Sequence, residues 1–241
     1  MGQGRLIGTA DDPAVQAVAA RALDLIGDGA RIGLGSGRAA AAFARRLAER
    51  VRAGLRMAAV PTSGATERLA RDLGIPLIAL DEGVELDLTV DGADEVAPNL
   101  DLVKGWGGAL VRERIVAAAS RRQVILVGSE KLVAALGQRG RIPLELIPLA
   151  RGPAMPRLRA LGLRPEVRTG ADGTEPTISD NGNLLVDCAP APVLPDAHAA
   201  RELEAALRAI PGVVDTGLFL GTAERVLVGY ADGRVEMLGG R

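Results

Sequence analysis

Three carboxylates and a lysine stand close together in the segment LDLTVDGADEVAPNLDLVKGWGGALVRERIV, residues 86–116. Asp91, Asp94 and Glu95 follow directly on an alternating apolar run that ends at Val90. Carboxyl groups this close raise one another's pKa, which suits one of them to proton transfer near neutral pH. The same oxygens could instead hold Mg²⁺, although calcium-loop spacing is absent, or they could form a solvated turn that caps a helix.

Lys104 begins a second chemical segment, Lys-Gly-Trp-Gly-Gly, which precedes a predicted helix over 109–120. Gly105 and Gly107 allow backbone N–H groups to approach a ligand, and a helix N-terminus favours negative charge. The lysine could neutralise a developing oxyanion, and Glu113, about one turn into the helix, could act as a base. Glu113 could also simply complement the helix dipole. Together with the acids, these groups favour an acid–base active site.

Two other small-residue turns could bind an anion, GLGSGRA (33–39) and PTSGATE (61–67). The first of them fits neither a dinucleotide fingerprint nor a P-loop. Ser36 and the neighbouring backbone N–H groups could cradle a small anion. Thr62 and Ser63 could hold phosphate, although capping of the following helix is the simpler role for either one.

The elements that must position these groups alternate between strands and helices. We predict strands at 31–35, 56–60, 75–80, 86–90 and 123–128, and helices at 13–26, 38–51, 64–74 and 109–120. Several strands are continuously apolar, as in a parallel sheet covered on both faces. Sites in such sheets lie beyond the carboxyl ends of the strands, where the turns after Leu34, Val60 and Val90 would meet. Lys131, just past the strand 123–128, would lie near the same edge.

The pattern changes near Gly137. A strand (142–150), a short helix (153–162), a strand (164–170), a hairpin (177–189) and an amphipathic helix (196–210) follow. Asn181-Gly182 is typical of a two-residue hairpin turn. We therefore predict a smaller α+β domain over 137–212, with a role in oligomerisation. Residues 1–136 and the tail 213–241, which has its own hairpin, would form a larger domain.

The overall composition excludes several classes of protein. Among 241 residues, 29 basic and 30 acidic side chains leave a net charge of −1, and the basic residues are not clustered. No nucleic-acid or membrane partner is therefore expected. A single cysteine, Cys188, cannot form an internal disulfide, the first residues lack a signal-peptide pattern, and no apolar run is long enough to span a bilayer. We expect a cytoplasmic protein.

In this order the segments resemble ribose-5-phosphate isomerase of type A. GLGSG corresponds to the first glycine-rich loop of that family, PTSGATERLARDLGIPL to its second, and VDGADEVAPNLDLVKGWGGALVRERIV to its most specific element. SEKLV, PLELIPLA, LRPEVRTG, TISDNGNLLVD and IPGVVDTGLF follow at similar intervals. The resemblance thus extends over nearly the whole chain.

The resemblance implies an enzyme that interconverts ribose 5-phosphate and ribulose 5-phosphate through an enediolate, without metal or cofactor. Glu113 would be the base, Asp91 with Asp94 beside it would assist ring opening and proton transfer at the sugar oxygens, and Lys104 would stabilise the enediolate oxygen. Substrate-binding positions would be Ser36, Gly37, Arg38, Thr62, Ser63, Gly105, Gly107 and Lys131. The implied fold is a Rossmann-like domain with a smaller ferredoxin-like one, in a homodimer or homotetramer.

Three departures from the family pattern concern the substrate contacts. The first loop usually reads G-x-G-T-G-S-T, whereas this chain has Arg38 and Ala39 in place of its last two hydroxyls. Trp106 replaces a glycine, and a lysine often found on the first helix is Val15. Arg38 could supply a replacement phosphate ligand, or Trp106 could narrow the pocket.

Two alternatives follow from these departures. One is an isomerase of the same family with a shifted sugar-phosphate substrate. The other is a non-catalytic sugar-phosphate-sensing domain, although the first 30 residues are too short for an attached helix-turn-helix. A relative of CoA transferases or deaminases is disfavoured by the D-G-A-D-E element.

Overall fold

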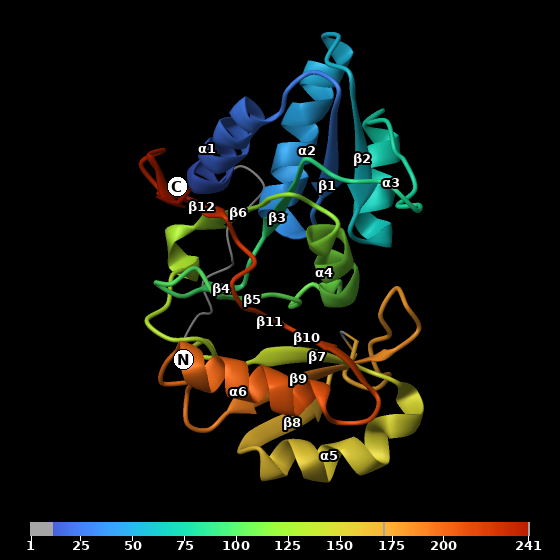
Figure 1. The fold of residues 1–241 in the computed structure, drawn as a ribbon, viewed down its shortest axis with the longest axis vertical. Coiled ribbons are helices and arrows are strands. Elements are labelled where there is room, and N and C mark those ends of the chain that lie inside the picture. The colour runs from blue at the N-terminus through green and yellow to red at the C-terminus, as the bar shows by residue number, and fades with distance from the viewer. Residues whose placement is uncertain (1–11, 171, 241) are drawn as a thin grey trace.

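The computed structural model of the chain describes residues 12–170 and 172–240. A six-stranded sheet and a four-stranded sheet are its main parts, and Figure 1 shows them one above the other with helix α4 (Leu110–Ala118) between them. No helix among the described residues is long and apolar enough to cross a membrane. Residues 1–11, from which we argued against a signal peptide, lie outside this described part.

The larger sheet has the strand order β13-β12-β6-β3-β1-β2, in which all neighbours pair in parallel except β12 with β13. Its strands are β1 (Ala30–Leu34), β2 (Met57–Pro61), β3 (Leu88–Gly92), β6 (Gln123–Gly128), β12 (Arg225–Gly229) and β13 (Val235–Gly239). The helices around it are α1 (Pro13–Ala22), a 3₁₀ turn (Leu23–Leu25), α2 (Gly37–Arg52), α3 (Gly64–Asp72) and α4. The predicted mostly parallel α/β sheet is confirmed.

Strand β6 is covered on both faces of the sheet. Val124 and Leu126 pack into the core that includes α1 and α2, whereas Ile125 and Val127 pack into a second core that includes the start of α4. All six residues of β6 are buried. A strand with two buried faces needs apolar residues at every position, which is why QVILVG shows no alternation.

The predicted strand 75–80 does not form. Ala59 of β2 donates its N–H to Pro76 O at 2.9 Å and accepts from Ile78 N at 3.0 Å, and only an isolated bridge with Leu77 results. Pro76 has no N–H to donate, so the ladder cannot extend through it. The large sheet therefore ends at β2.

The smaller sheet is antiparallel, with the order β10-β7-β9-β8. It contains β7 (Ile142–Leu146), β8 (Leu163–Val167), β9 (Leu184–Pro190) and β10 (Val213–Thr216), with a 3₁₀ turn (Pro148–Ala150) and helices α5 (Arg151–Ala160) and α6 (Ala197–Arg208). The chain order βαββαβ is that of a ferredoxin-like unit. Strand β10 lies just past residue 212, where we placed the end of this domain, so the smaller sheet uses part of the predicted tail.

The turn at Asn181-Gly182 differs from the two-residue turn that we predicted. Gly182 has a φ of +81° and donates its N–H to Ser179 O, whereas Asn181 has no positive φ. A two-residue type I′ turn needs positive φ at both central residues. The Asn181 side chain is instead held from two directions, since its Nδ2 donates to Glu145 Oε1 at 3.0 Å and its Oδ1 accepts from Arg112 Nε at 3.0 Å.

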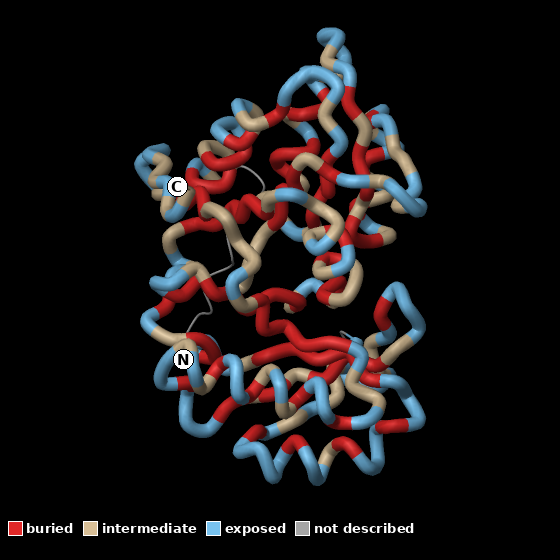
Figure 2. The backbone as a smooth tube through the Cα atoms, in the orientation of Figure 1, coloured by how far each residue is buried: buried red, intermediate tan, exposed pale blue. Residues whose placement is uncertain are grey.

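A short three-stranded sheet, β11-β5-β4, lies between the two larger sheets. Its strands are β4 (Glu95–Val96), β5 (Leu102–Val103) and β11 (Leu218–Phe219). Helix α4 contacts β3 of the larger sheet and β7 and β10 of the smaller one. Figure 2 shows many buried residues along both main sheets and in this middle region.

Candidate active site

The site is built where the order of the large sheet reverses. Strand β1 pairs with β2 on one side and with β3 on the other, so the loops that follow β1 and β3 leave the sheet in different directions. Ligands in open α/β sheets bind in the crevice at such a point. Here the loop after β1 supplies Ser36, the end of β3 supplies Asp91, and the 3₁₀ turn after β6 (Ser129–Lys131) supplies Lys131.

Asp91 connects these two loops. Its Oδ1 accepts hydrogen bonds from Ser36 N at 3.0 Å and from Gly92 N at 2.8 Å. A Cβ at Gly35 would lie 2.2 Å from the same Oδ1. Glycine is therefore required at position 35, because any side chain there would displace the Asp91 carboxylate.

Lys104 lies between two carboxylates in the interior. Its Nζ is 3.0 Å from Asp91 Oδ2 and 3.3 Å from Glu113 Oε2, and it also donates to Gly92 O. Lys104 is 2% exposed, Asp91 0% and Glu113 5%. Buried charges persist only when paired, so this triad is a cation shared by two acids from β3 and α4.

Burial and the neighbouring carboxylates set the proton affinities. Burial, and then the charge of Asp91, raise the pKa of Glu113 to about 8, and Lys104 opposes this only in part. Burial acts to lower the pKa of Lys104, but Asp91 and Glu113 outweigh it and hold that pKa above its ordinary value. Lys104 is thus a permanent cation, whereas Glu113 can exchange a proton near neutral pH.

Asp94 forms the pocket wall beside this triad. Its Oδ2 accepts from Trp106 N at 2.9 Å. Burial raises the pKa of Asp94, while the Trp106 N–H and the charges of Lys131 and Lys104 act against that rise. A carboxyl with a raised pKa is suited to exchanging protons with hydroxyl groups.

Glu95, the third acid of the motif, lies elsewhere. It is completely buried, and its two oxygens accept from Gly137 N and Arg139 N, both at 2.6 Å. Glu95 starts β4, and alternation along an extended segment turns its side chain away from that of Asp94. Its role is to hold the chain that leads into the smaller sheet.

The hydroxyl-rich turns meet at Ser36. Its Oγ is within hydrogen-bond distance of Thr62 Oγ1 (2.9 Å), Ser63 Oγ (2.8 Å) and Thr66 Oγ1 (3.1 Å). Ser63 also caps α3 by accepting from Thr66 N, as the simpler expectation had it. Thr62 and Ser63 therefore lie behind Ser36 and do not line the main pocket. Ser63 instead lines an adjacent pocket, and Ser36 lines both pockets.

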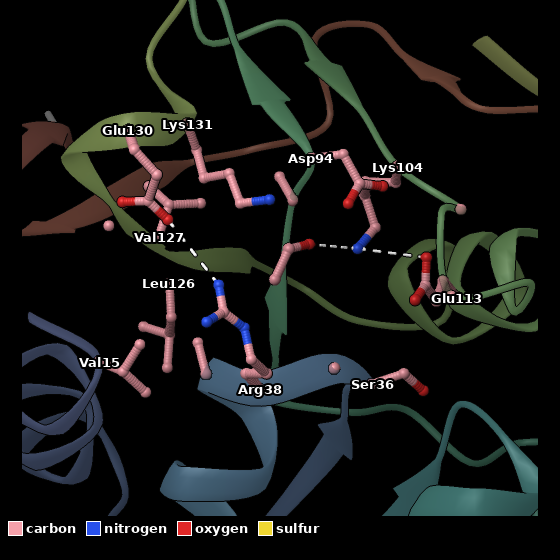
Figure 3. A pocket seen from close by; sticks show the side chains of 17 residues that line it. Val15, Ser36, Arg38, Asp94, Lys104, Glu113, Leu126, Val127, Glu130 and Lys131 are labelled. Atoms are coloured by element: carbon pink, nitrogen blue, oxygen red, sulfur yellow. Dashed lines mark hydrogen bonds and ion pairs between the residues drawn. The ribbon is translucent and has the colours of Figure 1, made fainter. Parts of the chain in front are cut away.

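The main pocket has two chemically different ends, which Figure 3 shows in close view. Arg38 and Lys131 lie toward one end, and Lys104 with Glu113 toward the other. Glu130 Oε1 is 3.9 Å from Arg38 Nη2. Burial lowers the pKa of Lys131. Nine of the twelve predicted site residues line this pocket, namely Ser36, Gly37, Arg38, Asp94, Lys104, Gly105, Gly107, Glu113 and Lys131.

Trp106 does not narrow the pocket. Its Nε1 donates to Arg141 O at 3.3 Å, and the Arg141 guanidinium lies 4.4 Å from the ring centroid. Arg139 and Lys131 each lie 5.4 Å from the same centroid. The indole ring thus lies against three cationic side chains, and Trp106 is not among the residues that line the pocket.

A metal ion was an alternative reading of the acids. Within residues 12–170 and 172–240, no group of three or more His, Cys, Asp or Glu side chains is placed to hold one. The Lys104 ammonium occupies the position between Asp91 and Glu113.

Comparison with known proteins identifies the family. The family profile of ribose 5-phosphate isomerase A (phosphoriboisomerase A) matches residues 58–233. The curated ribose-5-phosphate isomerase A of Roseiflexus castenholzii is 46% identical over 221 residues, which cover 91% of this chain and 92% of that protein. The chain belongs to the ribose-5-phosphate isomerase A family. The curated protein of the same name from Gloeobacter violaceus is also 46% identical, with 92% and 94% covered.

Solved structures of ribose-5-phosphate isomerases share the fold. One in complex with phospho-erythronic acid has a TM-score of 0.88 and 36% identity, covering 94% of this chain and 97% of that one. The isomerase A from Methanocaldococcus jannaschii has a TM-score of 0.88 and 38% identity, with 96% and 100% covered. The resemblance that we drew from the motifs and the predicted fold class are both confirmed.

Several positions in this isomerase-family site were not found from the sequence. Gly35 was read only as part of a glycine-rich turn, and Gly92 O was not considered as a partner for Lys104. Arg168 and Asp187, which hold the glycine loop from the smaller sheet, were missed because nothing in their local sequence marks them. Asp91 was predicted to be catalytic, yet it lies behind Lys104 and does not line the pocket.

Proposed function

We propose that this chain interconverts D-ribose 5-phosphate and D-ribulose 5-phosphate, with Glu113 as the base. The observation that carries this proposal is the Lys104 ammonium 3.3 Å from the carboxylate of Glu113, inside a pocket of a ribose-5-phosphate isomerase A family member. Removing a proton next to a carbonyl requires a positioned base and a fixed positive charge for the oxyanion. The Glu113 carboxylate and the Lys104 ammonium are these two groups, and they lie within hydrogen-bond distance of each other.

In the proposed reaction the furanose opens, and the Glu113 carboxylate takes the proton from C2 of the open-chain aldose. The electron pair moves to O1, which gives an enediolate. Glu113 then returns the proton to C1, while the proton on O2 moves to O1, and the product carries its carbonyl at C2. No other reactant is consumed, so one carboxyl group can serve in both proton transfers.

Lys104 and the glycine loop would stabilise the enediolate. The ammonium cannot lose its charge easily, because Asp91 and Glu113 keep its pKa high. Gly105 and Gly107 line the same pocket. A charged donor in a site sheltered from water contributes more than it would in solution.

Asp94 and Asp91 would have different roles, one in proton exchange and the other in holding Lys104. Asp94 lines the pocket and has a raised pKa, so we assign to it the proton exchange at the sugar oxygens, including ring opening. Asp91 is buried behind Lys104 and would hold the ammonium in place. This is a narrower role for Asp91 than the resemblance implies.

Arg38 and Lys131 would bind the phosphate. They are the cations at the end of the pocket away from Glu113, and Val15, which stands where the family often has lysine, lines the same end. Arg38 is the one basic side chain that this chain gains in its first loop relative to the family pattern. A guanidinium can contact phosphate through two parallel hydrogen bonds.

The test measures ribulose 5-phosphate formed from ribose 5-phosphate by wild type, by Glu113→Gln and by Glu49→Gln as a control on the exposed face of α2. We expect turnover by wild type and the control, and a loss of at least about a thousandfold in kcat for Glu113→Gln. A folded wild type that does not turn over ribose 5-phosphate would overturn the function. Near-full activity of Glu113→Gln would overturn only the choice of base.

A second set of substrates tests the alternative of a shifted specificity. Other aldopentose and aldohexose phosphates should be turned over with a much lower kcat/KM than ribose 5-phosphate.

The curated relatives match over nearly their whole length, which does not favour the non-catalytic sensing domain. We further propose a cytoplasmic homodimer or homotetramer, which size-exclusion chromatography with light scattering would test.

A further inference from the structure

Arg168 reaches from the smaller sheet to the glycine loop of the active site. It follows β8 directly, and its Nη1 donates to Trp106 O at 3.0 Å. Weaker contacts join Nη1 and Nη2 to Gly105 O at 3.4 and 3.3 Å. The side chain is 14% exposed. The carbonyls of two successive peptide groups in the segment 104–108 are therefore held by one guanidinium.

Asp187 of β9 fixes the direction of that guanidinium. Arg168 donates from Nε to Asp187 Oδ2 at 2.9 Å and from Nη2 to Oδ1 at 2.6 Å. Arg141 Nη1 adds a contact of 3.3 Å to Oδ2. The two-point pair leaves the Arg168 guanidinium little freedom to rotate, which ordinary ion pairs on a surface do not achieve.

Because a peptide group is planar and trans, the contact between Arg168 and a carbonyl also sets the direction of the N–H in the same peptide group. In a planar trans peptide, the N–H points opposite to the C=O. The peptide between Gly105 and Trp106 behaves in this way, since its C=O faces Arg168 and its N–H donates to Asp94 Oδ2 at 2.9 Å. In the next peptide the C=O of Trp106 faces Arg168, so the N–H of Gly107 must point away from Arg168. Gly107 lines the pocket beside Lys104 and Glu113.

We propose that Arg168 is a positioning residue for the isomerase reaction, which holds the Trp106–Gly107 peptide so that the Gly107 N–H donates to the enediolate oxygen. This inference rests on the proposed function. Arg168 touches no substrate and acts through the loop, and Asp187 acts through Arg168. The smaller sheet thereby contributes to transition-state stabilisation, although the lining residues named above come from the larger sheet, the middle sheet and the segments that connect them.

The assignment predicts an effect on kcat rather than on substrate capture. Arg168 contacts Asp187 and the carbonyls of Gly105 and Trp106, whereas Arg38 and Lys131 lie at the phosphate end of the pocket. Charge builds up on the enediolate oxygen only in the transition state, so a misdirected donor lowers kcat and leaves KM nearly unchanged. A general loss of packing between the two sheets would lower stability and affect both constants.

The experiment compares Arg168→Met, Arg168→Lys and Asp187→Asn with Arg164→Met, which changes an exposed arginine of the neighbouring strand β8. We expect Arg168→Met to lower kcat about 10- to 100-fold with KM within about threefold, and the lysine variant, which can reach one carbonyl, to be intermediate. Asp187→Asn should lower kcat in the same direction, and Arg164→Met should not. Thermal melting identifies any variant that fails to fold.

Binding of phospho-erythronic acid by calorimetry provides a readout without turnover. Its carboxylate can accept the hydrogen bonds intended for the enediolate, whereas inorganic phosphate tests only the other end of the pocket. Arg168→Met and Asp187→Asn should weaken phospho-erythronic acid about tenfold or more and leave phosphate binding unchanged. Unchanged kcat in folded variants, or equal losses for both ligands, would overturn the positioning role. An inactive wild type would count against the proposed function instead.

Discussion

The Nζ of Lys104 lies 3.3 Å from Oε2 of Glu113, in a position where both groups are almost completely buried. A second carboxylate, Asp91, takes a closer place on the same ammonium at 3.0 Å. One cation therefore has to serve two acids, and it cannot fully satisfy both. Asp91 has the closer contact and two backbone N–H donors in addition, whereas burial and the charge of Asp91 raise the pKa of Glu113.

Replacing Lys104 should abolish most of the activity. In Lys104→Met, the enediolate loses its charged partner, and Asp91 and Glu113 are left as neighbouring buried acids without a cation. We expect kcat to fall by about 10²- to 10³-fold, as for the loss of a strong oxyanion donor. Steady-state kinetics on protein whose circular dichroism matches wild type measures this. A decrease below tenfold would contradict the oxyanion role.

The pH dependence should report the proton on Glu113. The base must be ionised to remove the C2 proton, and burial with Asp91 raises the pKa of Glu113 to about 8. We expect kcat/KM to rise with pH through an apparent pKa well above the 4.5 of an ordinary glutamate. Because Glu113 interacts with the charges of Lys104 and Asp94, the midpoint belongs to the group as a whole. An activity that is already constant above about pH 5.5 would contradict a raised pKa.

The raised pKa of Glu113 predicts that the folded enzyme becomes less stable as the pH rises. Between the ordinary value of 4.5 and about 8, the folded chain keeps a proton on Glu113 that the unfolded chain has lost. Unfolding free energy therefore falls as pH rises through this window, by at most about 1.4 kcal/mol per pH unit. Glu113→Gln removes the titration.

Thermal melts of wild type and Glu113→Gln across this window provide the measurement. The two Tm values should be similar near about pH 3.5, where Glu113 is neutral in both states, and the variant should become the more stable one toward about pH 8. Glu49→Gln, on the surface, serves as the control. A Tm difference that does not change with pH would show that Glu113 does not titrate in this range.

The sequence predicted that Asp91, Lys104 and Glu113 would lie together in the fold, because they are close together along the chain. Asp91, Lys104 and Glu113 fall within one segment, and the strand that ends at Val90 places the first of them at the carboxyl edge of the sheet. That inference depends only on local pattern and on a general rule for parallel sheets. The alternation of apolar strands and helices indicated the fold class for the same reason.

The remaining features depend on contacts between distant segments. Arg168 reaches Trp106 from the smaller sheet, and nothing near Arg168 in the sequence marks it as different from the other arginines. Glu95 adjoins Asp94, and only the partners Gly137 and Arg139 show that it is structural. The three cations that lie against the Trp106 ring all come after residue 130. Local composition cannot encode any of these contacts.

Glu95 should matter for stability and not for catalysis. In Glu95→Gln, one oxygen becomes an NH₂ group that faces the N–H of Gly137 or Arg139, so a buried donor loses its acceptor. We expect a loss of about 1–3 kcal/mol in the free energy of unfolding, with kcat of the folded protein within about twofold of wild type. Urea unfolding and kinetics at low temperature measure the two effects. A large decrease in kcat with unchanged stability would place Glu95 in the reaction.

Arg38 should determine how well this chain binds the phosphate of its substrate. Arg38→Ser restores the hydroxyl of the family pattern, but Val15 still lacks the ammonium that the family often carries on the first helix. Hydrogen bonds to a charged group contribute about 1.5–3 kcal/mol, so KM should rise about tenfold or more while kcat changes little. Val15→Lys in the Arg38→Ser background should recover part of the affinity, because Val15 lines the same end of the pocket. Arg45→Ser, which changes an exposed arginine about two turns further along α2, should leave KM unchanged. If Arg38→Ser binds substrate as tightly as wild type, Lys131 and the backbone N–H groups of α2 hold the phosphate without Arg38.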